Sequence, residues 1–271
     1  MLRKLYYALP PKWRLWVRRL VYLPTDILRQ RDRSIPPKGM IYTGSGDFKA
    51  QGEQWLNWFK TLTYLQPNSK VLDIGSGIGR IAIPLSGFLT TEGQYCGFDA
   101  VEQGVVWCQE NIGKQHPNFD FKYINLFNDL YKSAGIEAAS FVFPYHDNAF
   151  DMACAISVFT HLLPEETLNY LEQTYRVLAK DGYLVATFFL LNDESRRQME
   201  QESTFNFRYY FGNYSLMDKQ VKAANVAYNE DFLLEAIQKI GFTHSTTIRG
   251  YWCGNNKGND NDFQDILVLR K

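Results

Sequence analysis

The sequence predicts an α/β protein built on a mostly parallel sheet with helices on both faces. The main observation is an alternation, from residue 70 onward, of short apolar runs typical of buried strands with segments of helical length. The second observation is the composition, because 271 residues with 45% hydrophobic and 15% aromatic content can bury a sizeable core as one large domain or two small ones. A predominantly disordered chain is therefore excluded.

Each element follows from a local pattern. Strands are expected at residues 70–74, 94–99, 121–124, 150–157, 183–191, 242–248 and 263–270. Helices are expected at residues 79–89, 103–114 and 127–134, around Leu168, Leu171, Tyr175 and Leu178, and at 229–240. Ahead of the sheet, Asp47 is expected to cap a helix with the apolar face Trp55, Leu56, Phe59 and Leu62. Residues 192–228 break the alternation, and we interpret them as a cap inserted after the fifth strand.

The start of the chain is a basic arm. Lys plus Arg equals Asp plus Glu, at 29 each, but residues 1–39 carry ten cations and two anions, a net +8 that leaves −8 for the remainder. Residues 12–23 predict an amphipathic helix with the apolar side chains Trp13, Trp16, Val17 and Leu20. Pro24 is expected to interrupt it before a second short helix at Ile27 and Leu28. We therefore divide the chain into an arm or lid, residues 1–46, and a domain, residues 47–271.

Several classes of protein are disfavoured. The four cysteines are scattered, which favours reduced core thiols in a cytoplasmic protein, and the four histidines are equally dispersed, so no metal site is expected. Pro10, Pro11 and Lys12 break the opening apolar stretch, which favours neither a secretory signal nor a membrane span. The balanced net charge gives no reason to expect a nucleic-acid partner.

The clearest motif is the run Val71-Leu-Asp-Ile-Gly75-Ser-Gly77-Ile-Gly79-Arg80, an apolar strand that ends in a glycine turn and opens a helix. Such a turn lets the backbone approach a ligand closely. Its glycines are spaced G-x-G-x-G after an acid, Asp73, whereas the dinucleotide fingerprint is G-x-G-x-x-G with no acid required. Asp73 suits a ligand amine, and Asp99 ends the second strand, where an acid binds ribose hydroxyls in nucleotide-binding folds.

At these residues the sequence resembles the class I S-adenosylmethionine-dependent methyltransferases, particularly the bacterial small-molecule group called type 11. The resemblance covers roughly residues 40–191 and rests on four motifs in order. They are Val71–Arg80, Gly97-Phe98-Asp99, Phe143-Pro-Tyr with Phe150-Asp151 leading into Ser157-Val-Phe-Thr-His161, and Val177-Leu-Ala-Lys-Asp-Gly182. It implies a Rossmann-like, seven-stranded, mostly parallel sheet with an antiparallel last strand, an N-terminal helical lid and the insertion after the fifth strand.

The resemblance also implies a pocket for S-adenosylmethionine and its product S-adenosylhomocysteine along the carboxyl ends of the strands. The implied contacts are Asp73, Gly75, Ser76, Gly77, Arg80, Asp99, Ala100, Asn125, Leu126, Ser157 and Val158. Asp73 and the glycine turn would meet the methionine moiety, Asp99 the ribose, Asn125 and Leu126 the adenine, and residues 157–158 would close the methionine side. Family members commonly have Asp at the position of Asn125, but an amide can also pair with an exocyclic amine. Arg80 either contacts the cofactor carboxylate or forms a structural ion pair.

The implied reaction is methyl transfer to a small-molecule acceptor, with O- or N-methylation favoured. His161 is the candidate base, because it follows the fourth strand and titrates near neutrality; the competing interpretation is that it buttresses the next helix. The aromatic residues of the insertion line an acceptor pocket or form a packed lid; they are Phe205, Phe207, Tyr209, Tyr210, Phe211 and Tyr214.

Two alternatives stay open at this point. The arm is a lid or packed helix, in which case Trp13, Trp16, Val17 and Leu20 should be buried, or residues 12–23 contact an anionic membrane and the acceptor is a lipid or quinone. We expect burial, because apolar patches are uncommon on soluble monomers. The second alternative to methyl transfer is a cofactor-binding module without turnover.

Overall fold

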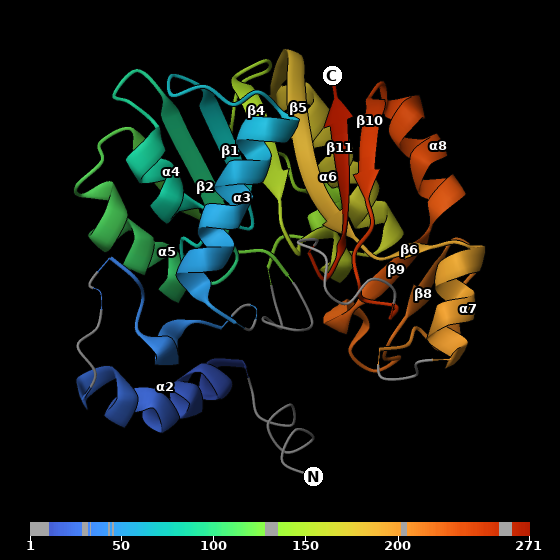
Figure 1. The fold of residues 1–271 in the computed structure, drawn as a ribbon, viewed down its shortest axis with the longest axis horizontal. Helices are drawn as coiled ribbons and strands as arrows, with labels where there is room; N and C mark the ends of the chain where they lie inside the picture. Colours follow the sequence, from blue (N-terminus) through green and yellow to red (C-terminus); the bar gives the residue numbers. More distant parts are fainter. Residues whose placement is uncertain are drawn as a thin grey trace.

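The computed structural model describes residues 11–28, 32, 34–42, 44, 46–127, 135–201, 205–254 and 262–271. Its centre is a seven-stranded sheet in the order β10-β11-β5-β4-β1-β2-β3 (Figure 1). The strands are β1 (Lys70–Ile74), β2 (Gln94–Asp99), β3 (Phe119–Tyr123), β4 (Phe150–Ala155), β5 (Leu178–Phe188), β10 (Thr243–Ile248) and β11 (Asp265–Arg270). Neighbours from β3 to β5 pair in parallel, and β11 is antiparallel to β5 and β10. The predicted sheet and its antiparallel last strand are confirmed.

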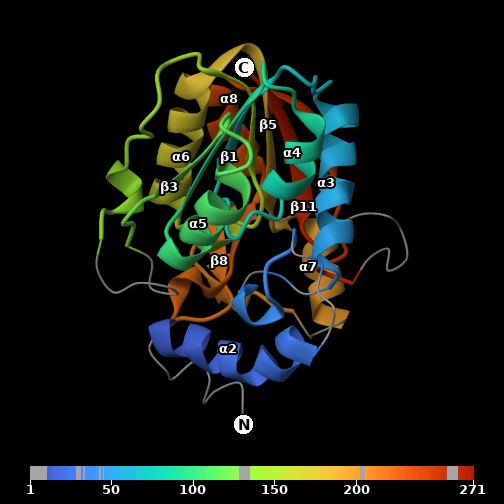
Figure 2. The same cartoon turned by 90° about the vertical axis from the view of Figure 1, so that its left-hand side faces the viewer.

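Helices cover both faces of this sheet (Figure 2). Side chains of α3 (Phe48–Leu62), α4 (Ala82–Phe88) and α5 (Glu102–Cys108) share one buried cluster with alternate strand residues such as Val71. Side chains of α6 (Pro164–Val177) and α8 (Glu230–Ile240) share the other with residues such as Leu72. Because successive side chains of a strand point to opposite faces, fully buried strands supply both clusters.

Local signals start and stop the helices largely as expected. Asp47 caps α3 by accepting hydrogen bonds from the backbone N–H groups of Lys49 and Ala50, both at 3.0 Å. α8 ends at Gly241, whose φ of 118° is left-handed. α5 continues as a π-helical turn, η2 (Gln109–Gly113), so the helical run agrees with the expected 103–114 to within one residue. β5 begins at Leu178 rather than 183, so that boundary was wrong. The helix expected at 127–134 falls outside the described residues from 128 onward.

The insertion after β5 is more than a polar cap. It contains α7 (Asp193–Gln201), the short helix η5 (Lys222–Ala224) and three strands that join β6 (Leu190–Leu191) in a second sheet, ordered β6-β9-β8-β7. These strands are β7 (Tyr209–Tyr210), β8 (Tyr214–Leu216) and β9 (Val226–Asn229). Phe205 and Phe207 pack there against Phe189 and Trp252, as core side chains of this small sheet.

The arm differs from expectation in two ways. α2 (Pro11–Leu28) is one helix that runs through Pro24, where two short helices were predicted. Asp26, near the end of α2, accepts hydrogen bonds from the backbone N–H groups of Lys38 (2.8 Å) and Gly39 (3.0 Å). These two residues belong to η1 (Lys38–Met40), so the hydrogen bonds hold α2 against η1.

The predicted burial of the apolar face of α2 is wrong where the structure describes its side chains. Trp16, Val17 and Leu20 are exposed, because the face of α2 that meets η1 carries Arg18, Tyr22 and Asp26 instead. The side chain of Trp13 lies outside the described residues. In both views α2 lies beyond the edge where the parallel strands end (Figures 1 and 2).

Candidate functional site

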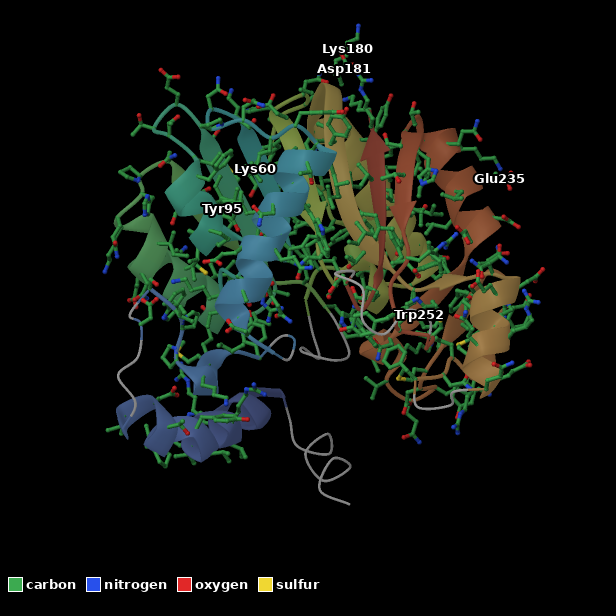
Figure 3. All side chains as sticks on the ribbon, in the orientation of Figure 1. Lys60, Tyr95, Lys180, Asp181, Glu235 and Trp252 are labelled. Carbon is green, nitrogen blue, oxygen red and sulfur yellow. The ribbon has the colours of Figure 1, made fainter. Side chains whose placement is uncertain are left out.

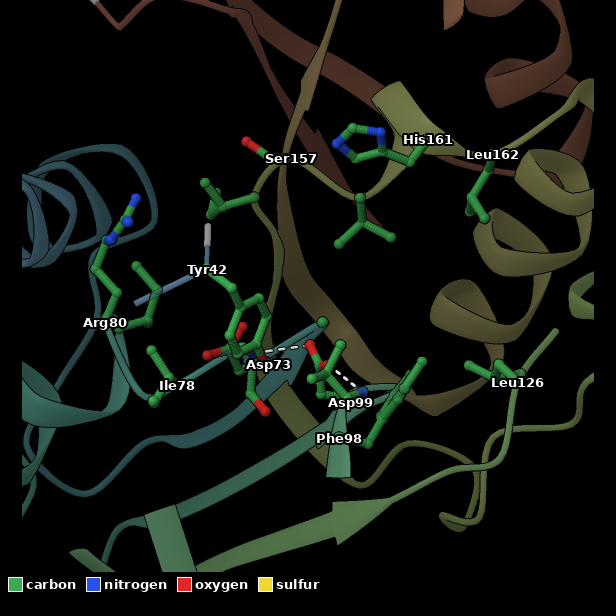
Figure 4. Close-up of a pocket in the computed structure, with 18 of the residues that line it drawn as sticks. Tyr42, Asp73, Ile78, Arg80, Phe98, Asp99, Leu126, Ser157, His161 and Leu162 are labelled. Carbon is green, nitrogen blue, oxygen red and sulfur yellow. Dashed lines mark hydrogen bonds between the residues drawn. The ribbon is translucent and has the colours of Figure 1, made fainter. Parts of the chain in front are cut away.

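A cavity of about 350 Å³ lies at the carboxyl ends of the parallel strands (Figure 4). The turns after β1, β2 and β4 form most of its wall, and Tyr42 and Gly44 add a contribution from the segment between η1 and α3. In a parallel sheet these turns meet at one edge, so residues far apart in the sequence are collected around one space. The cavity volume is in the range of small-molecule sites.

The glycine turn depends on backbone conformations that favour glycine. Gly75, Gly77 and Gly79 have φ values of +73°, +58° and +83°, all left-handed. A Cβ on Gly75 would lie 2.6 Å from Cγ2 of Val158, so glycine also allows the turn after β1 to pass close to the turn after β4. The backbone N–H groups of Gly75 and Ser76 donate to the carbonyl of Phe98, at 2.9 and 3.0 Å.

Asp99, at the end of β2, holds two of these turns together. Its Oδ2 accepts a hydrogen bond from the N–H of Gly77 at 2.8 Å, and its Oδ1 accepts one from the N–H of Val101 at 2.7 Å (dashed in Figure 4). Burial raises the pKa of this carboxyl, and the two N–H groups and the neighbouring Tyr42 hydroxyl oppose the rise. The carboxyl group also lines the cavity, where it can meet a ligand.

Asp73 is the second acid of the cavity and is almost completely buried, at 2% exposure. It accepts a hydrogen bond of 2.6 Å from the hydroxyl of Tyr95, and the thiol of Cys154 lies 3.5 Å away. Burial raises the pKa of Asp73 to about 6, although the Tyr95 hydrogen bond acts in the opposite direction. The site thus contains a carboxyl that would gain from a cationic partner.

The turn after β4 brings Ser157 and His161 to the cavity wall. Ser157 has a φ of +58°, an uncommon conformation for a residue other than glycine, and its N–H donates to Oγ1 of Thr187 at 2.7 Å. His161, in η4 (Phe159–His161), has Nδ1 2.7 Å from the carbonyl oxygen of Ala223. Because a carbonyl only accepts, Nδ1 carries the proton and Nε2 of the neutral ring has the lone pair. Burial lowers the pKa of His161, which favours that neutral ring.

Arg80 forms another part of the wall (Figure 4). Its guanidinium lies 5.2 Å from the ring centroid of Phe48, and burial lowers its pKa while the nearby Asp262 opposes this. Arg80 lines the cavity, which favours a contact with the cofactor carboxylate, and it has the acidic neighbour Asp262, which favours a structural ion pair.

Eleven of the twelve candidate residues line this one cavity; Asn125 does not, and its side chain is exposed. Sequence reasoning missed several lining residues, including Tyr42, Phe98, Phe127, Tyr170 and Gln264. Phe98 was in a quoted motif and directly precedes Asp99, so it was within reach. Tyr170 and Gln264 come from α6 and from the approach to β11, and no local pattern marks them. Of the two interpretations of the aromatic residues at 205–214, the acceptor-pocket one gains no support here, because none of them lines this cavity.

Residues 72–186 match a family model described as a methyltransferase domain. Among solved structures, a Pyrococcus horikoshii OT3 protein is similar at 15% identity with a TM-score of 0.57, covering 86% of this chain and 94% of its own. The cyclase SpnF is similar at 17% identity and a TM-score of 0.54, covering 96% and 95%. A SAM-dependent methyltransferase from Aquifex aeolicus matches at 18% identity and a TM-score of 0.47, covering 81% and 88%.

The structural likenesses concern the fold, whereas the family match covers the glycine turn, both acids and the turn after β4. These are the segments that surround the cavity. Residues 72–186 are therefore similar to a methyltransferase domain, and the chain shares its fold with these solved structures.

Proposed function

We propose that this chain transfers a methyl group from S-adenosylmethionine to a small-molecule acceptor. One observation carries the proposal: the buried Asp73, the half-buried Asp99 and the two left-handed glycines Gly75 and Gly77 face a single cavity at the strand ends. Asp99, an acceptor at the cavity wall, suits the ribose hydroxyls, and Asp73 suits the ammonium of the methionine moiety. On the adenine side, Leu126 lines the cavity and is the proposed contact. Asn125, the residue before it, does not line the cavity.

The residues present fit such a cofactor in one further respect. The hydroxyl of Ser76 is buried, lines the cavity and has no hydrogen-bond partner in the described part of the chain. Buried polar groups are normally satisfied, so this hydroxyl is available to a polar ligand group. The cofactor, when bound, supplies a methyl group that its sulfonium has already activated.

The protein's own contribution is then to position the two reactants and to move one proton. Nε2 of His161 accepts the proton of an acceptor hydroxyl or ammonium, while the hydrogen bond from Nδ1 to the Ala223 carbonyl fixes the ring. Such a base serves the methylation of a hydroxyl or of a protonated amine. Positioning in the enclosed cavity contributes most of the remaining acceleration.

A membrane-peripheral form of the same function is the second candidate, with a lipid or quinone as acceptor. The observation that favours it is the exposed apolar side of α2, at the strand-end edge where the cavity lies (Figure 1). A helix that covered the cavity as a lid would bury that side instead.

The test combines binding and turnover. The purified chain is titrated with S-adenosylhomocysteine in a calorimeter and then incubated with S-adenosylmethionine and a panel of hydroxyl and amine acceptors. We expect binding, and with a productive acceptor His161→Gln should lower turnover about 100-fold or more at unchanged S-adenosylhomocysteine affinity. Equal turnover of the variant would make His161 structural. Binding without turnover on every acceptor would favour the module that binds cofactor without catalysis.

A further inference from the structure

The most unusual surface of the described chain is one side of α2. Trp16, Leu20 and Ile27 are 61%, 55% and 70% exposed, and Val17, Val21 and Leu23 are exposed with them. At 100° per residue, Trp16, Leu20, Leu23 and Ile27 form a single stripe along the helix. We call this stripe, with Val17 and Val21, the apolar side of α2.

This side faces away from the rest of the described chain. The opposite side of α2 is held against η1: Asp26 accepts the two backbone N–H groups there, and the Tyr22 ring lies 5.1 Å from Nζ of Lys38. Gly39 lies so close to the helix that a Cβ on it would be 2.9 Å from Cα of Arg19. The fastening of α2 thus uses its polar side and leaves its apolar side in solvent.

The charge of the helix indicates what covers the apolar side. α2 contains four cations, Lys12, Arg14, Arg18 and Arg19, and a single acid. That acid, Asp26, is engaged by η1. Residues 1–39 as a whole are +8 and the rest of the chain is −8, so a negatively charged surface attracts the arm and repels the body. An anionic surface therefore orients the molecule with α2 toward it.

We propose that α2 lies flat on an anionic phospholipid bilayer, with its apolar side inserted among the acyl chains near the headgroups. A helix of modest length that carries Trp and Leu side chains on its apolar side and cations elsewhere binds membranes in this way. None of the helices that the structure describes is long and apolar enough to cross a bilayer. The binding does not depend on methyl transfer, but the strand-end edge, where the cavity lies, would face the membrane (Figure 1).

The experiment is flotation of the full chain with vesicles of phosphatidylcholine alone and of phosphatidylcholine mixed with phosphatidylserine, at low and high salt. Wild type should float with the phosphatidylserine vesicles at low salt and lose most of that binding at high salt. Leu20→Glu and Ile27→Glu should each lower the partition coefficient at least about tenfold, because each removes an aliphatic side chain that the bilayer would bury.

Matched controls separate this surface from general effects. Tyr64, just past the end of α3, is 72% exposed, comparable to Ile27, and Tyr64→Glu should leave binding unchanged. Arg19→Gln should lower binding about fivefold, because one cation near an anionic surface contributes about 1 kcal/mol of binding free energy. Lys180→Gln, on the opposite edge of the molecule from α2 (Figure 3), should not lower it.

Three results would overturn the proposal. The first is no flotation of wild type with phosphatidylserine vesicles at low salt. The second is flotation that Leu20→Glu and Ile27→Glu leave intact. The third is a wild-type dimer by light scattering that these variants convert to monomer without any vesicle binding, which would make the apolar side an interface between two copies. Calorimetry with S-adenosylhomocysteine on the same proteins reports the cavity separately, so failure of docking and failure of the proposed function are distinguishable.

Discussion

The protonation of Asp73 should control how tightly the cavity binds a cationic ligand. In the free protein this buried carboxyl has a pKa of about 6, against 3.8 in an unfolded chain. The ammonium of S-adenosylhomocysteine would interact favourably with the ionised form only. Binding therefore requires that Asp73 lose its proton, and affinity should increase as the pH rises through 6.

The magnitude follows from the pKa. With a value of about 6, roughly a tenth of the Asp73 side chains are ionised at pH 5 and roughly nine tenths at pH 7, so the affinity for S-adenosylhomocysteine should differ about tenfold between these conditions. The raised pKa also affects folding. The folded state holds a proton that the unfolded chain has released, so the free energy of unfolding falls as the pH rises from about 4 to about 6. The contribution of Asp73 to this fall is about 3 kcal/mol.

The assay is isothermal titration calorimetry with S-adenosylhomocysteine at pH 5, 6 and 7, in buffers of different ionisation enthalpy. Wild type should release a proton on binding at pH 5. Asp73→Asn, which keeps an acceptor for the Tyr95 hydroxyl, should bind more weakly at pH 7 and with little pH dependence. Asp99 and His161 also have shifted pKa values, so a wild-type slope retained in Asp73→Asn would assign the proton to one of them and refute the reasoning.

Two further perturbations test other carboxylates. Asp99→Ala should weaken S-adenosylhomocysteine binding by about 1.5–3 kcal/mol in calorimetry, because it removes a charge-assisted contact and leaves the N–H of Gly77 without its acceptor. The control is Asp181→Ala, at an exposed residue, which should leave the affinity unchanged. Unchanged affinity in Asp99→Ala would remove the ribose assignment. Asp265→Ala leaves three buried donors unpaired, the N–H groups of Leu190 and Gly250 and the Trp252 indole, so urea unfolding should show a loss of about 3 kcal/mol or more. The control is Asp147→Ala, which breaks an ion pair with an exposed carboxylate and should cost less than about 1 kcal/mol. A loss as small as that in Asp265→Ala would contradict the stabilising role of its three hydrogen bonds.

Local patterns predicted most of the sheet. The bounds of β1 and β2 agree with expectation, those of β4, β10 and β11 differ by one or two residues at one end, and those of β3 differ by two and one residues at its two ends. The four cysteines are buried and free, as expected of core thiols. Buried parallel strands are short apolar runs bounded by polar turns, so a few consecutive residues are enough to predict each strand. The neighbouring strands do not have to be known.

The insertion and the arm were less predictable. Tyr and Phe residues in 205–214 suggested a ligand wall, but Phe205 and Phe207 pack into the small sheet while Tyr210 and Phe211 are exposed. An aromatic side chain is equally suited to a core, a pocket or a surface, and only its neighbours decide among them. The same holds for α2, whose amphipathic pattern was evident but whose polar side, through Asp26, made the contact with η1.

The sequence by itself determined the fold class, the glycine turn and the two acids, because each depends on residues adjacent in the chain. The tertiary structure decided which side chains share the cavity. It brought Tyr42, Tyr170 and Gln264 to the same cavity as the glycine turn, left Asn125 exposed and set the carbonyl of Ala223 against His161. It also set the pKa values, since burial raises that of Asp73 to about 6 and lowers that of His161. Burial and long-range contacts arise from packing between distant segments, and a local pattern contains no record of them.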